Sequence, residues 1–198
     1  MARPFDQHKR SQILADVVEY MCTHGVADLS LRQAAASLGT TSRMLVYYFG
    51  TKENLLAEAL ATQHPNPTEM FLGVHDGDSL RTGLLTWWTT MRGDNDTARS
   101  TRLMLQAMSR AVGGDCPFTK YATRLITEGV ADVSAAIVRT GVPEQRAADL
   151  ATGAISGLRG ILMDYAITGD ARRTDLAARR LIELIVNDAC PERAEVTA

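Results

Sequence analysis

The chain has 198 residues, of which 45% are hydrophobic and 22% charged, and its net charge at pH 7 is -2. These values are ordinary for a globular protein of one or two domains, and they argue against a disordered chain or a basic protein that coats nucleic acid non-specifically. Three widely spaced cysteines, outside any Cys/His cluster, indicate neither a disulfide framework nor a zinc site.

The pattern along the chain predicts an all-α fold. The six prolines lie at boundaries and leave long uninterrupted stretches, and no convincing alternation of period two predicts a strand. The polar N-terminus and the absence of a bilayer-length apolar run favour a cytoplasmic location with no membrane contact. We expect a loop at 70–78, and helices over residues 6–24, 30–38, 42–49, 52–63, 80–91, 97–112, 118–140, 143–167 and 175–189.

Residues 29–60 hold three short predicted helices separated by two abrupt turns. Ser30 is placed to cap the first of them, and Gln33 completes a capping box. Gly39 can end that helix in the left-handed conformation, and only two threonines separate it from the helix that begins at Ser42. This spacing predicts a helix-turn-helix.

The second helix of this pair cannot bury all of its apolar side chains. Residues 44–49 are all apolar or aromatic, and a helix with 3.6 residues per turn must expose some of them. Leu45 and Phe49 are the expected inward pair, which leaves Ser42, Arg43, Met44, Tyr47 and Tyr48 toward solvent or a ligand. Thr51 is expected to cap the next helix, and Lys52 in its first turn calls for a nearby anion such as phosphate.

This segment resembles the TetR family of one-component transcriptional regulators over residues 8–61. The residues that carry the resemblance are Gly39, Thr41, Leu45, Tyr47, Phe49, Lys52, Glu53 and Leu55. It implies a helix-turn-helix DNA-binding domain at 1–63 and a helical effector-binding and dimerisation domain at 64–198. Many members carry a tyrosine at the position of Val46, where its hydroxyl contacts phosphate, so this chain departs from the pattern there.

The expected partner is a palindromic double-stranded DNA operator, read in the major groove by two copies of the second helix. Arg43 is the best candidate for a base contact, because a guanidinium can donate two bonds to guanine. The candidate DNA-binding residues are Arg32, Thr41, Ser42, Arg43, Met44, Tyr47, Tyr48 and Lys52. For Tyr48, packing against the first helix is an equal alternative. Arg3, Lys9 and Arg10 are further candidates for phosphate contacts, or else belong to a solvated arm.

The helix at 143–167 carries glycines at positions 153, 157 and 160 on a face that is otherwise apolar. Interior glycines destabilise a helix, so a compensating close approach of another helix is expected. We predict that the last two helices form a homodimer interface, as the resemblance implies, through Gly153, Gly157, Gly160, Ile161, Leu181, Leu184 and Ile185. The alternative is that both helices pack into the core of their own chain.

Large adaptable side chains on the middle helices suit a pocket for a small apolar or aromatic effector. These candidates are Trp87, Trp88, Met91, Met104, Met108, Phe118, Tyr121, Leu125, Met163 and Tyr165, although such residues also fill ordinary cores.

The sequence offers no convincing catalytic set. No histidine follows His75, and no glycine-rich phosphate loop follows a strand, so we expect neither an enzyme nor a cofactor or metal site. Two hypotheses remain for the function. One is a repressor released from DNA by a small apolar molecule. The other is a regulator without such an effector, whose helical domain is a protein-interaction module.

Overall fold

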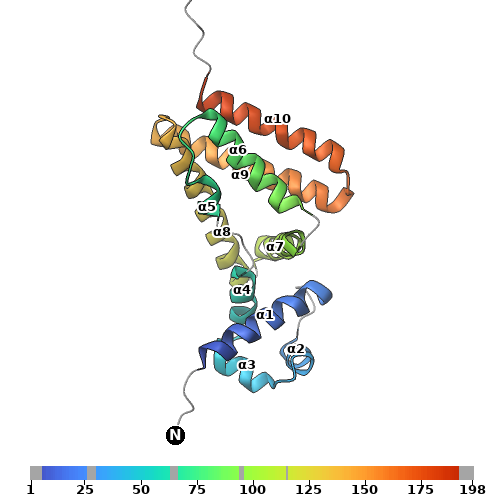
Figure 1. Cartoon of the computed structure of the whole chain (residues 1–198). Helices are drawn as coiled ribbons and strands as arrows, with labels where there is room; N and C mark the ends of the chain where they lie inside the picture. The colour runs from blue at the N-terminus through green and yellow to red at the C-terminus, as the bar shows by residue number, and fades with distance from the viewer. Residues whose placement is uncertain (1–5, 26–29, 63–66, 94–95, 115, 192–198) are drawn as a thin grey trace, which may run out of the picture. The chain divides into compact units, whose positions relative to one another are not determined.

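The computed structural model describes residues 6–25, 30–62, 67–93, 96–114 and 116–191, and all regular structure in these ranges is helical (Figure 1). The predicted all-α fold is confirmed. The helices of the described residues are α1 (Gln7–His24), α2 (Leu31–Ser37), α3 (Ser42–Phe49), α4 (Lys52–Ala61), α5 (Pro67–Phe71), α6 (Gly77–Arg92), α7 (Asp96–Val112), α8 (Cys116–Arg139), α9 (Glu144–Thr168) and α10 (Ala171–Ala189). None of them is long and apolar enough to cross a membrane.

The chain forms two compact units. The first consists of Met1–His64 and Asn95–Thr123, and the second of Pro65–Asp94 and Arg124–Ala198. The domain boundary expected between residues 63 and 64 lies outside the described residues. The first unit also takes in α7 and the start of α8, which the sequence analysis assigned to the second domain.

The first unit is built around α1. Its apolar stripe is buried and consists of Ile13, Leu14, Val17, Val18 and Met21. This stripe recurs at spacings of three and four residues, so it forms one side of the helix. α1 packs against α2, α4 and α7, and α3 packs between α2 and α4. The helix-turn-helix therefore packs against the buried stripe of α1 rather than projecting alone.

In the second unit, α9 and α10 lie side by side as an antiparallel hairpin, and α6 packs on both (Figure 1). The short helix α5 docks on α6 through Phe71, which is fully buried beside Gly83. A Cβ at Gly83 would lie 2.9 Å from the Phe71 ring, so the close approach requires a glycine. Arg139, at the end of α8, donates to the carbonyl oxygens of Phe71 and Val74.

Three helices depart from the predicted pattern by more than two residues. α5 (Pro67–Phe71) was not predicted, and its last two residues lie in the segment expected to be a loop. α6 begins at Gly77, before the predicted start at residue 80, because the Asp76 and Ser79 side chains form a reciprocal capping box there. α10 begins after Asp170, whose carboxylate accepts from the backbone N–H of Arg173. Thr174, the residue before the predicted start of this helix, is fully buried and donates its hydroxyl to the Asp170 carbonyl.

Candidate nucleic-acid interface

The turn between α2 and α3 is fixed by local interactions that the sequence predicts. The Ser30 hydroxyl caps α2 by accepting from the backbone N–H of Gln33 at 3.1 Å. Gly39 has a φ of 59°, the left-handed conformation that glycine adopts without strain. The Thr41 side chain then accepts from the backbone N–H of Met44, so α3 begins at Ser42 as predicted. These contacts form a helix-turn-helix.

The inner side of α3, which packs against the rest of the first unit, is apolar, as expected. Leu45 and Phe49 are buried on its inner side, and Leu55 of α4 is fully buried beneath them. On the outer side, Arg43, Val46 and Tyr47 are exposed, with 52% of the Tyr47 surface accessible. Ser42 and Met44 are half-buried, and Thr41 is exposed. α3 therefore presents Arg43, Val46 and Tyr47 to solvent.

The structure corrects the orientation expected for Tyr48. The sequence placed it among the exposed residues, but only 8% of its surface is accessible. Its ring lies edge-on to the Tyr47 ring, with centroids 5.1 Å apart. The buried alternative therefore describes the position of Tyr48 better, because the inner face of a helix this short extends to three of its last five residues.

The cations around α3 are not engaged inside the protein. Arg32 and Arg43 are exposed and Lys52 is half-buried, and none of the three forms an ion pair or hydrogen bond through its side chain with any described residue. Lys52 occupies the first position of α4 after the Thr51 cap, which accepts from the backbone N–H of Asn54. An anion near this end of α4 would meet both the lysine and the positive end of the helix dipole.

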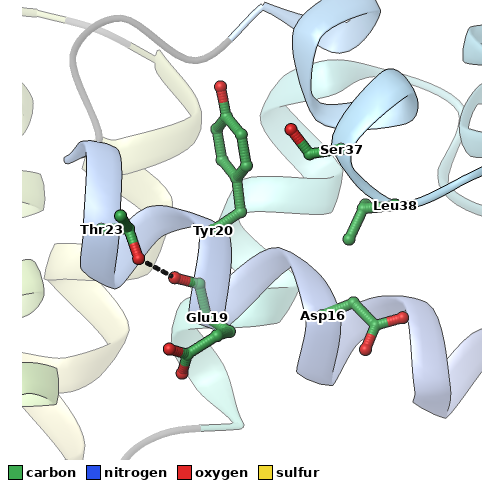
Figure 2. A pocket seen from close by; sticks show the side chains of 6 residues that line it. All are labelled: Asp16, Glu19, Tyr20, Thr23, Ser37 and Leu38. Carbon is green, nitrogen blue, oxygen red and sulfur yellow. Dashed lines mark hydrogen bonds between the residues drawn. The ribbon is translucent and has the colours of Figure 1, made fainter.

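An open groove of about 390 Å³ on the first unit carries acidic side chains, in contrast to the cations around α3 (Figure 2). It lies between α1 and the end of α2 and is lined by Asp16, Glu19, Tyr20, Thr23, Ser37 and Leu38. Two carboxylates at its edge would repel a phosphate backbone. The groove therefore does not extend the cationic surface around α3.

The sequence matches no protein-family model and no curated protein. Solved structures do match. A TetR transcriptional regulator from Legionella pneumophila superposes with a TM-score of 0.67 at 15% identity, covering 93% of this chain and 98% of its own. This chain has the fold of the TetR regulators.

Two further structures with this fold carry informative descriptions. SmeT, the repressor of the Stenotrophomonas maltophilia multidrug efflux pump SmeDEF, has a TM-score of 0.71 at 16% identity over 90% of this chain and 89% of its own. The multidrug binding protein EbrR, complexed with proflavin, has a TM-score of 0.66 at 18% identity over 89% of this chain and 99% of its own. Identities this low establish the TetR fold alone.

The ten residues predicted to bind an effector divide between the two units of the TetR fold. Met104, Met108, Phe118 and Tyr121 belong to the first unit, and Trp87, Trp88, Met91, Leu125, Met163 and Tyr165 belong to the second. Most of them are buried, whereas Met163 is exposed on α9. Among the described residues, no three His, Cys, Asp or Glu side chains form a group that could hold a metal ion.

Trp88 has a structural role that the sequence analysis missed. Its indole N–H donates to Oδ1 of Asp175 on α10 at 2.9 Å. The same carboxylate oxygen lies 2.9 Å from Nε of Arg92, whose guanidinium lies over the Tyr165 ring of α9. These four side chains tie α6, α9 and α10 together, so the polar end of Trp88 is already occupied.

The structure redistributes the residues predicted for the dimer interface. A Cβ at Gly157 would lie 2.5 Å from Cδ2 of Leu181 on α10, and one at Gly153 would lie 3.8 Å from Cδ1 of Ile185. Both glycines therefore face α10 of their own chain, and Ile185 is buried there. Of the three α9 glycines predicted for the interface, only Gly160 has no atom within 4 Å of the place that a Cβ would take. Gly153, Gly157, Leu181 and Ile185 therefore pack within their own chain, and the predicted homodimer interface stays a prediction.

A different set of side chains covers the outside of the α9–α10 hairpin. Leu184 is 68% exposed and Ile167 is 79% exposed, and Met163, Ile161, Leu176 and Gly160 are also partly or largely accessible. We call Gly160, Met163, Ile167, Leu176 and Leu184 the outer hairpin face. The signal in the sequence was the position of these residues, which fall outside the buried stripes of α9 and α10.

Proposed function

We propose that this chain is a sequence-specific, DNA-binding transcriptional regulator that reads a palindromic operator as a homodimer. The observation that carries the proposal is the outer side of α3. There a capped helix with an apolar inner side presents Arg43 and Tyr47 to solvent, and Arg32 and Lys52, which pair with no described residue, precede and follow it in the sequence. A helix entering the major groove needs such an arrangement, with side chains for bases and cations for phosphates.

The roles proposed for individual residues follow their positions. Arg43, Thr41, Ser42 and Met44 lie in the first turn of α3 or at its cap, where a recognition helix contacts base edges. Lys52 and Arg32 are placed for phosphate contacts. Tyr47 contributes an exposed ring for the sugar-phosphate backbone, and we assign the buried Tyr48 to support of that ring. Val46 is exposed, so the phosphate contact attributed to a tyrosine there in many TetR regulators has no counterpart.

A homodimer is supported by the outer hairpin face. Exposed leucine, isoleucine and methionine side chains gather on adjacent helices, and such a patch is typical of a protein interface. Charges on the hairpin fit a second copy. Arg172 lies near the α9–α10 turn and Asp149 lies toward the opposite end of the hairpin, and neither forms an ion pair with a described residue. A two-fold axis across the hairpin brings these opposite ends together.

We further propose that the regulator is a repressor released by a small apolar or aromatic effector. The support is the set of buried aromatic and methionine side chains, together with the description of EbrR as a multidrug binding protein complexed with proflavin. Release requires the effector to bind more tightly to the state in which the two copies of α3 no longer match the operator.

The test of DNA reading is selection of binding sites from a random duplex library at a fixed salt concentration, with the stoichiometry of the selected complex measured. The expected product is a palindrome bound by a dimer, with half-sites separated so that the two copies of α3 lie roughly 34–36 Å apart or a multiple of this. Recovery of no preferred sequence by a folded dimer would contradict the proposal.

The outer hairpin face also favours a second candidate, a regulator without a small effector whose helical domain binds another protein. Oligomeric state discriminates the two. If the chain is monomeric while this face remains exposed, a different protein becomes the expected partner. If it is dimeric, the face is occupied and a screen of apolar and aromatic compounds for release of the selected DNA becomes the next test.

A further inference from the structure

The guanidinium of Arg10 lies where three helices of the first unit meet. Arg10 is in the first turn of α1, and its side chain is only 26% exposed. Its Nη2 donates to Oε2 of Glu58 on α4. Its Cζ lies 4.9 Å from the centroid of the Phe49 ring, at the end of α3. One side chain of α1 therefore contacts the helix proposed to read DNA and the helix that follows it.

This environment differs from that of the other cations in the helix-turn-helix. Arg32 and Arg43 are exposed and make no ion pair with a described residue, whereas Arg10 gives a donor to a carboxylate and its face to an aromatic ring. Guanidinium groups combine these two interactions because they are planar and carry donors at their edge. An arginine engaged in this way is not available as an extended phosphate ligand.

We infer that Arg10 is a positioning residue for DNA reading, and not the phosphate contact that its place in the sequence suggests. The inference rests on the proposed function. Phe49 is the last residue of α3, and the helix ends at Gly50. The Arg10 guanidinium holds the Phe49 ring against α1, and Glu58 holds the guanidinium in place. The pair therefore fixes the end of a helix of only eight residues, and with it the direction in which Arg43 and Tyr47 project.

The two roles predict opposite effects of removing the acid. If Arg10 positions α3, Glu58→Gln weakens DNA binding, because the guanidinium loses its anchor. If Arg10 binds phosphate, Glu58→Gln strengthens binding, because it removes a competing carboxylate and a negative charge. Glu19→Gln, at an exposed acid of α1, is the matched control for the change in charge. We expect Glu58→Gln and Arg10→Ala each to weaken binding of the selected duplex about ten-fold.

The salt dependence of binding separates the roles a second time. A phosphate contact contributes about 0.9 to the slope of log K against log salt concentration. We expect Arg10→Ala to keep the wild-type slope and Lys52→Ala to lower it by about 1. Arg10→Lys keeps the charge but not the planar group, so it should restore little of the affinity. Stronger binding by Glu58→Gln, or a reduced slope with full rescue by lysine, would overturn the inference.

A measurement without DNA tests the effect of the Arg10 contacts on α3 separately from the proposed function. Amide hydrogen exchange over residues 45–49 should become faster in Arg10→Ala and in Glu58→Gln than in the wild-type protein. The double variant should exchange no faster than the single variants, and exchange in α10 should stay unchanged in all of them. Failure of the wild-type protein to bind any duplex would contradict only the proposed function. Unchanged exchange in α3 of both variants would refute the positioning role whether or not DNA binds.

Discussion

The outer side of α3 and the outer hairpin face both expose apolar or aromatic side chains, yet the sequence predicted most of the first and little of the second. α3 has eight residues between a threonine cap and Gly50, so its inner pair, Leu45 and Phe49, leaves few choices for the rest. α9 has 25 residues and α10 has 19, and both carry apolar residues on more than one side. In such helices, periodicity alone does not tell which apolar side packs against other helices of the same chain and which remains exposed.

The glycines illustrate this difference. Gly39 and Gly50 end short helices with positive φ, a local requirement that can be read from the sequence. Gly157 allows Leu181 of the neighbouring helix to approach, a requirement that arises only after α9 and α10 have paired. A glycine at a helix end is therefore explained by the conformation of its own turn. A glycine inside a helix is explained by the close approach of a neighbouring helix that the sequence does not identify.

The outer hairpin face should produce the largest effect when it is charged. We expect Leu184→Glu to dissociate the dimer and abolish binding to the palindrome, because buried interface anchors contribute about 2 kcal/mol or more each and the symmetry repeats the change. Sedimentation equilibrium measures the dissociation constant. Leu72→Glu is the matched control, since Leu72 is similarly exposed but lies outside this face. Equal effects of both variants would remove the support for the assigned interface.

The outer side of α3 can be tested by separating base contacts from phosphate contacts. We expect Arg43→Ala to lose about 1–3 kcal/mol of binding energy on the selected operator and to relax the base preference at one position. Lys52→Ala should weaken binding to all sequences alike. Competition titrations with single-base variants of the operator measure both effects. If both variants lost base preference to the same extent, the division of roles along α3 and α4 would be wrong.

The two interior glycines of α9 should respond in opposite directions. We expect Gly157→Ala to destabilise the second unit by about 1–3 kcal/mol, because its Cβ would press on Leu181. Gly160→Ala should stabilise it by up to about 1 kcal/mol, since no atom lies within 4 Å and alanine favours a helix.

Thermal unfolding in the Leu184→Glu background measures both glycine effects without a contribution from dimerisation. Combining Gly157→Ala with Leu181→Ala should recover part of the loss, because the clash is removed. A stabilising Gly157→Ala would show that the α9–α10 contact adjusts more easily than the packing indicates.

The smallest expected effect concerns the turn between α9 and α10. The Arg173 guanidinium donates to both carboxylate oxygens of Asp164, at 2.6 and 2.7 Å, and thereby lowers the pKa of this carboxyl below its ordinary value. A lowered pKa adds stability above the unfolded-state value, and this stability is lost as the pH falls through the folded-state value. Acid should therefore loosen the turn only slightly, because the pair is exposed.

Carbon-detected NMR titration of the Asp164 carboxyl measures this shift. Asp164→Asn should reduce the loss of thermal stability between pH 6 and pH 3 by a small amount relative to Glu144→Gln, which removes from the same helix an exposed acid that pairs with no described residue. A carboxyl that titrates at its ordinary pKa in Asp164 would mean that the ion pair does not persist in solution.

The sequence by itself determined the all-α fold, the helix-turn-helix with its caps at Ser30 and Thr51, and the exposure of Arg43 and Tyr47. These features depend on interactions between residues three or four positions apart, and such interactions can be predicted directly from the sequence. Tertiary structure decided the rest.

Tertiary packing buried Tyr48, engaged Arg10 with Glu58 and Phe49, tied Trp88 to Asp175, and turned two glycines of α9 toward their own chain. Each of these outcomes, apart from the burial of Tyr48, joins residues on different helices, and the longest of them spans 87 positions. Periodicity identifies a helix face that can be buried, but only the packing of helices against one another selects which neighbour, charge or ring that face meets.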